Sequence, residues 1–130
     1  MSKICTTLEQ SKKLIEIGID VYTADMFWKN GASNEYIQCF TPFVSSGTNV
    51  DFDYDIPAWS LTALLDILKS EIDGEEGECY QLNIEKDGAW WNVFYKEQYD
   101  GAKPIETESA EELVDACYKM IIKFHDLNMF

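Results

Sequence analysis

The segment ECYQLNIEKDGAWWNVFYKE, residues 78–97, constrains the fold of this chain more than any other stretch. Apolar and polar residues alternate on both sides of Asp87-Gly88, which is the pattern of half-buried strands. An Asp-Gly dipeptide between two such runs predicts a two-residue type I′ hairpin turn. A turn at these two residues would pair Glu85 with Trp90 and Ile84 with Trp91.

The two faces of this predicted hairpin differ in character. One face is apolar and suits a core; it pairs Ile84 with Trp91, Leu82 with Val93 and Tyr80 with Tyr95. The other face is mostly polar but carries Trp90 and Phe94. These two rings are either isolated surface aromatics or part of a protein-binding surface.

Residues 6–18 predict an N-terminal helix, in which Thr7 and Gln10 form a capping box and Gly18 ends the helix. The aromatic-rich runs 23–29 and 35–43 favour strands. Asn30-Gly31 between them predicts a second hairpin.

Residues 50–56 alternate strictly, with Asp51, Asp53 and Asp55 between apolar residues. This period predicts a half-buried strand whose carboxylates face water. A calcium-binding loop is the alternative, but such a loop needs glycine at its sixth position and glutamate at its twelfth. Ile56 and Thr62 occupy those positions.

Residues 56–70 predict a second helix, with Pro57 in its first turn and Asp55 or Ser60 as cap. The helix is apolar on more than one side, so it is expected to be buried against the sheet or between two subunits. Trp59, Leu61 and Leu65 are therefore candidate residues of a protein-binding surface, as are Trp90 and Phe94 on the hairpin.

Residues 109–130 predict the last helix, with a capping box from Ser109 and Glu112 and one apolar stripe. The acidic segment 71–78 and the segment 99–108 are predicted to be loops. His125, the sole histidine, is expected to be a capping or surface residue.

The predicted fold is a single α+β domain over residues 1–130. The element order α-β-β-β-α-β-β-α and the short turns predict a five-stranded antiparallel sheet, with helices packed mainly on one face.

The chain carries 24 acidic residues and 10 lysines, a net charge of −14, and no arginine. Such a field would repel a phosphate backbone, so direct nucleic-acid binding is not expected. The chain shows no secretory signal and no membrane-spanning run, which predicts a cytoplasmic protein without a membrane partner. Its four cysteines form no CxxC pair and are expected to be reduced, structural thiols.

The sequence lacks the common nucleotide-binding, metalloprotease and serine-hydrolase motifs. It therefore predicts no enzyme activity and no catalytic, cofactor-binding or metal-ligating residues.

Three segments, DIPAWSLTALLDIL, AWWNVFY and ESAEELVDACYKMIIKFHDLN, resemble an uncharacterised family of short acidic proteins from gut bacterial and phage-derived genomes. The resemblance implies an accessory protein and transfers no site residue. In element order alone, the chain is similar to type III secretion chaperones. That similarity implies a homodimer that binds an unfolded client.

Three hypotheses follow for function. The first is a non-enzymatic protein-binding module, homodimeric through residues 57–70 and possessing chaperone-like activity. The second is an inhibitor that mimics nucleic acid with its carboxylates. The third is weak binding of a divalent cation at Asp51, Asp53 or residues 73–78.

Overall fold

The computed structural model of the protein describes residues 3–29, 41–44 and 55–129. Three α-helices lie within these ranges: α1 (Leu8–Glu16), α3 (Leu61–Ile67) and α4 (Leu113–Asp126). A short 3₁₀ helix, η1, spans Val21–Thr23. The described strands are β1 (Met26–Lys29), β2 (Thr41–Val44), β3 (Ile56–Ala58), β4 (Glu71–Asp73), β5 (Cys79–Asp87), β6 (Trp90–Lys96) and β7 (Glu106–Ala110).

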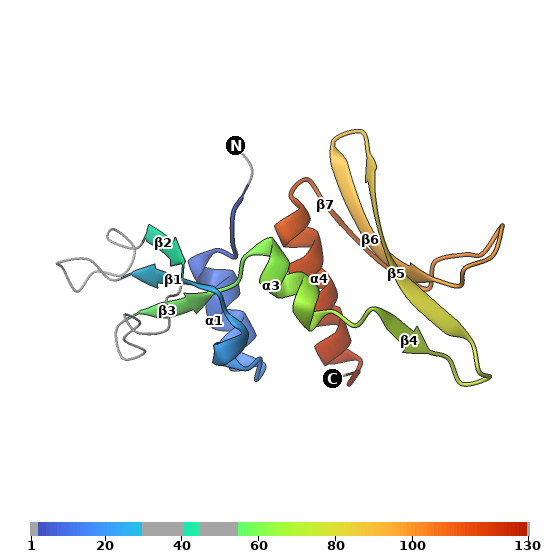
Figure 1. The fold of residues 1–130 in the computed structure, drawn as a ribbon, viewed down its shortest axis with the longest axis horizontal. Helices are drawn as coiled ribbons and strands as arrows, with labels where there is room; N and C mark the ends of the chain where they lie inside the picture. The colour runs from blue at the N-terminus through green and yellow to red at the C-terminus, as the bar shows by residue number, and fades with distance from the viewer. Residues whose placement is uncertain (1–2, 30–40, 45–54, 130) are drawn as a thin grey trace.

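The strands form two antiparallel sheets. One contains three strands in the order β2-β1-β3, and the other contains four in the order β4-β5-β6-β7. Figure 1 shows the helices between the two sheets, with the three-stranded sheet at one end of the molecule and the four-stranded sheet at the other. The α+β class is confirmed, but the prediction of a single five-stranded sheet is wrong.

The main core joins the helices to the four-stranded sheet. Val93 and Tyr95 of β6 are fully buried against α4, where the rings of Phe124 and Tyr95 are tilted by 45° with their centroids 5.2 Å apart. A smaller cluster of Cys5, Met26 and Ala58 packs beneath the three-stranded sheet. The two sheets therefore pack against separate clusters of buried side chains.

The β5–β6 hairpin forms, but its register differs from the prediction. Asp87 pairs with Trp90, so the two turn residues are Gly88 and Ala89. Gly88 has φ +62° and Ala89 has no positive φ, which matches a turn with glycine at its first central position. The predicted turn would have forced Asp87 into the left-handed region. Each residue of β5 therefore pairs with a β6 residue two positions further along the chain than predicted. Because the shift is an even number, each side chain keeps its predicted face of the sheet.

Two strands occupy segments that the sequence predicts as loops. β4 lies within the predicted loop 71–78. β7 begins in the predicted loop 99–108 and ends in the first two residues of the predicted helix 109–130. Ser109 consequently lies in β7, and its hydroxyl group is 2.5 Å from the side-chain oxygen of Asn92. The predicted capping box is wrong, because α4 begins after Glu112, which makes no side-chain cap.

The segment 56–70 is a strand followed by a helix, not one helix. Pro57 lies in β3, and the α3 helix begins after Ser60, whose hydroxyl caps Ala63. Asp55 is 2% exposed, so the prediction that its carboxylate faces water is wrong. Asp51 and Asp53, with most of the predicted strand 50–56, lie outside the described residues.

Two predictions near the N-terminus are confirmed. Thr7 and Gln10 form the capping box of α1, and Gly18 ends the helix with φ +96°. The antiparallel pairing of β1 with β2 is also as predicted, but Lys29 pairs with Thr41, so a tight turn at Asn30-Gly31 does not join the two strands. Residues 30–40 themselves lie outside the described ranges. No helix of the described chain is long and apolar enough to span a membrane.

Candidate functional site

The four-stranded sheet turns one face toward α4 and one face away from it. Side chains alternate along each strand, so the residues that flank buried Val93 and Tyr95 point away from α4. We call this second side of the sheet the outer face. The register assigns to it Glu71, Asp73, Cys79, Gln81, Asn83, Glu85, Asp87, Trp90, Asn92, Phe94, Lys96, Thr107 and Ser109.

The two aromatic residues of the outer face differ in exposure. Trp90 is 50% exposed beside the hairpin turn, whereas Phe94 is 5% exposed. The ammonium group of Lys96 lies 6.0 Å from the centroid of the Phe94 ring. Of the two predicted surface aromatics, only Trp90 presents a large area to a partner.

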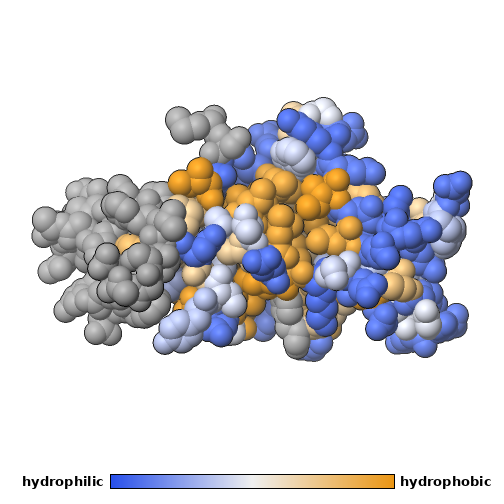
Figure 2. Space-filling view, in the orientation of Figure 1, coloured by the Kyte–Doolittle hydropathy of each residue, from blue (hydrophilic) through white to orange (hydrophobic). Residues whose placement is uncertain are grey.

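Negative charge is concentrated at this end of the molecule. Residues 71–100 contain nine acidic side chains and two lysines. The register places Lys86 on the face opposite Glu85 and Asp87, and its ammonium lies 5.2 Å from the centroid of the Trp91 ring. The carboxylates of the β5 tip therefore have no lysine on their own side of that strand. Figure 2 shows this end as largely hydrophilic.

Hydrogen bonds order part of the outer face. The thiol of Cys79 donates to the carboxylate of Glu71 at 3.0 Å, which links β5 to β4. This hydrogen bond, followed by burial and nearby acids, raises the pKa of Cys79. Asn83 donates to the carbonyl of Gln81 at 2.9 Å. The face thus offers carboxylates, amides and one indole ring, which suit binding of a cationic and hydrogen-bonding partner.

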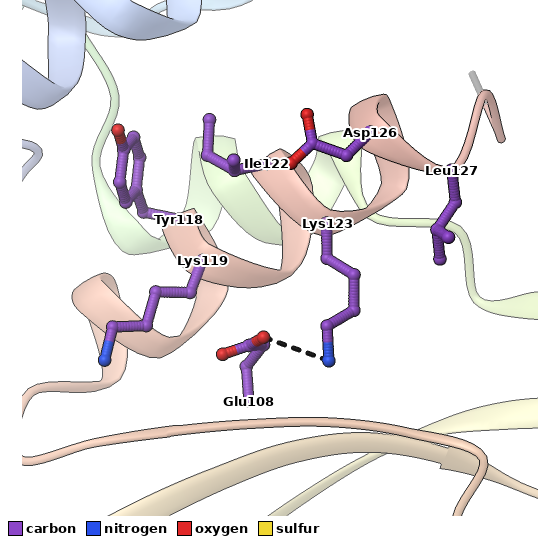
Figure 3. Close-up of a pocket in the computed structure, with 7 residues that line it drawn as sticks. All are labelled: Glu108, Tyr118, Lys119, Ile122, Lys123, Asp126 and Leu127. Carbon is purple, nitrogen blue, oxygen red and sulfur yellow. Dashed lines mark ion pairs between the residues drawn. The ribbon is translucent and has the colours of Figure 1, made fainter.

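A second feature is an open pocket of about 370 Å³ beside α4 (Figure 3). Its lining residues are Glu108, Tyr118, Lys119, Ile122, Lys123, Asp126 and Leu127. Lys123 forms ion pairs with Glu108 at 3.0 Å and with Glu106 at 3.8 Å. Burial, followed by the charge of Glu16, raises the pKa of the Tyr118 phenol. The lysines of this pocket are engaged with β7, so they fasten the helix to the sheet.

The predicted interface residues of the segment 57–70 are placed differently from one another. Trp59 is fully buried, and its indole donates to Thr23 at 2.9 Å, so it belongs to the core and not to the surface. Leu61 and Leu65 are half-buried against the core. In Figure 2, hydrophobic side chains gather over the middle of the visible face, where α3 and α4 lie.

The described thiols differ in exposure. Cys5 and Cys117 are buried, and burial raises their pKa values to about 11 and about 12. Cys79 is exposed, unlike the buried thiol expected for an apolar segment. His125 lies in the last turn of α4. Within the described ranges, no cluster of three or more His, Cys, Asp or Glu side chains could hold a metal ion.

Sequence reasoning missed the contribution of β4 to the outer face. Glu71 and Asp73 were predicted to lie in a solvated loop, yet they flank Ile72, which is 6% exposed. The alternation of these three residues was the available signal. It was too short to separate from the acidic turn that follows.

Comparisons of the chain with protein-family models, with curated proteins and with solved structures find no significant match.

Proposed function

We propose that this chain is a non-enzymatic protein-binding module whose outer face binds a basic segment of a partner protein. The observation that carries the proposal is the position of half-exposed Trp90 directly opposite Asp87, on the face that also presents Glu85. An exposed tryptophan beside carboxylates favours lysine and arginine side chains, which interact with both the ring and the charge.

The charge of the chain supports a basic partner over a second copy. Each copy has a net charge of −14, and half of that excess lies in residues 71–100. Bringing two such faces together would place like charges side by side, which opposes association. A cationic partner would be attracted at long range and held at short range.

A matched pair of charge reversals tests the proposal. The probe is a synthetic peptide of alternating lysine and threonine residues, titrated by calorimetry into the intact chain. Glu85→Lys with Asp87→Lys alters the outer face, whereas Glu9→Lys with Asp66→Lys alters exposed positions on α1 and α3. Both double variants change the net charge equally.

We expect the outer-face variant to bind the probe at least about tenfold more weakly than the control variant. Equal weakening of the two variants would mean that only the overall charge attracts the peptide. That result, or the absence of binding by the unaltered chain, would contradict the proposal.

Mimicry of nucleic acid is a second candidate, and it uses the same acidic end of the molecule. It is favoured by the segregation of the acidic side chains, since nine of them lie in residues 71–100. The partner would then be the basic surface of a nucleic-acid-binding protein. A single-stranded oligonucleotide and the chain would compete for such a partner, and simultaneous binding would exclude this candidate.

Dimerisation through α3 is a further candidate, with a chaperone-like role. It is supported by the half-buried Leu61 and Leu65 and by the apolar area over α3 and α4 in Figure 2. The observed element order contains two strands, β4 and β7, beyond the order that resembled the secretion chaperones. Light scattering tests this candidate, because a monomer at high salt, where charge repulsion is screened, would exclude it.

A further inference from the structure

We infer that the basic partner binds as an additional β-strand along β4, the outermost strand at one end of the four-stranded sheet. This inference rests on the proposed function and specifies how the partner binds. It follows from the direction of the backbone groups in the two outermost strands, β4 and β7, and from what covers those groups.

The hairpin turn fixes the direction of every backbone group in the sheet. In a two-residue hairpin, the residues flanking the turn, here Asp87 and Trp90, exchange backbone hydrogen bonds. Because the direction alternates along a strand, the even-numbered residues of β5 turn toward β4. The hydrogen bond from the amide of Leu82 to the carbonyl of Ser70, 2.9 Å long, agrees with this direction.

The same alternation decides what β4 presents to solvent. Ile72 lies opposite Tyr80 and turns its backbone groups toward β5. Glu71 and Asp73 therefore direct their amide and carbonyl groups away from the sheet. Among the described residues, no side chain donates a hydrogen bond to either of these carbonyls. Strand β4 can accordingly pair with one more strand.

The opposite edge of the sheet is covered. In β7, the backbone groups of Thr107 and Ser109 point outward by the same alternation. The ammonium of Lys123 donates to the Thr107 carbonyl at 3.0 Å, and that of Lys119 donates to the Ser109 carbonyl at 3.2 Å. Lysines at an outer strand discourage addition of another chain. The sheet thus has one edge closed by lysines and one edge bordered by carboxylates.

The side chains of β4 select the kind of strand that can be added. Glu71 and Asp73 both lie on the outer face, so an added strand would place alternate side chains beside them. Lysine or arginine at those positions would be paired with a carboxylate. The β4 strand of a second copy would oppose acid with acid, which is destabilising. The occupant is therefore an extended, lysine- or arginine-containing segment of another protein.

The test compares hydrogen bonding with charge at one position. Asp73→Pro removes the outward amide and obstructs the edge, and Asp73→Asn removes only the charge. Proline is tolerated where the amide faces solvent, and circular dichroism with thermal unfolding would verify that both variants fold. The probe is the alternating lysine–threonine peptide, used alongside a version whose amides are methylated at every second residue.

We expect Asp73→Pro to bind the peptide about tenfold more weakly than Asp73→Asn, and methylation to weaken binding by a similar factor. Slower hydrogen exchange at the amides of residues 71 and 73 should accompany binding of the unmethylated peptide. If the peptide binds but neither change weakens it, strand addition is wrong while the proposed function stands. If the peptide does not bind the unaltered chain, both are overturned.

Discussion

Trp90 lies directly opposite Asp87 in the β5–β6 register, so an indole ring that is 50% exposed stands beside a carboxylate on the same face of the sheet. An anchor of this kind should matter for binding more than for folding. We expect Trp90→Ala to weaken binding of the lysine–threonine peptide about tenfold. The free energy of unfolding should change by less than about 1 kcal/mol.

Tyr22→Ala is the control for that experiment, because Tyr22 is 81% exposed and lies outside the four-stranded sheet. Its affinity for the peptide should match that of the unaltered chain. Equal losses in the two variants would show that exposed aromatic rings contribute without regard to position.

Thr6 is a fully buried polar residue that connects three parts of the fold. Its hydroxyl lies 2.7 Å from that of Ser11 and accepts a hydrogen bond from the amide of Trp59 at 3.1 Å. Thr6→Val keeps the volume of the side chain but leaves the Ser11 hydroxyl and the Trp59 amide without the Thr6 hydroxyl as a hydrogen-bond partner. We expect a loss of about 1–3 kcal/mol in the free energy of unfolding, measured with urea. Thr62→Val, at an exposed position of α3, should change it by about 0.5 kcal/mol or less.

Asp115 connects the N-terminal segment to α4. Partial burial of the carboxyl group acts to raise its pKa. Hydrogen bonds from Lys3 and Gln10, both 2.8 Å long, and the charges of nearby lysines act in the opposite direction and outweigh burial. The pKa of Asp115 is therefore lowered. A lowered pKa in the folded state contributes stability above the unfolded-state pKa, and that stability is lost as pH falls through the folded-state value.

Asp115→Asn should therefore be less stable than the unaltered chain at neutral pH, and the difference should shrink in acid. Urea unfolding at a series of pH values measures it. Parallel stability curves for the two proteins across the acid range would show that this carboxylate makes no such contribution.

Cys79, Cys5 and Cys117 should differ sharply in reactivity. At mildly alkaline pH, iodoacetamide should modify exposed Cys79 in the folded chain and spare the two buried thiols, as mapped by peptide mass spectrometry. Glu71→Gln should accelerate the modification of Cys79, because the Glu71 carboxylate raises the pKa of this thiol. An unchanged rate would argue against the hydrogen bond between them.

The local signals in the sequence predicted the elements whose cause is local. The capping box of Thr7 with Gln10 and the hairpin around Gly88 depend on neighbours in the chain, and both form. The turn itself was placed one residue too early, because Asp-Gly and Gly-Ala both provide a glycine at a central position. The alternation of side chains still assigned Trp90 and Phe94 to one face.

The elements that depend on distant partners could not be predicted. β7, with the sequence ETESA, has no apolar pattern, and it is a strand because β6 offers backbone groups on that side. β3 and β4 have three residues each, too few for a recognisable period. The burial of Phe94 and Asp55 is likewise a property of the folded chain. Consequently the polar face of the β5–β6 hairpin was visible in the sequence, whereas the addition of Glu71 and Asp73 from β4 to that face was not.

The most direct test of the central claim is a map of where a basic peptide contacts the chain. Chemical-shift perturbation by the lysine–threonine peptide, recorded at physiological ionic strength, reports each backbone amide and each tryptophan indole. We expect the shifts to concentrate at the Trp90 indole and along β4 and β5. Shifts that concentrate on α3 and α4, or that spread evenly over the molecule, would contradict the account.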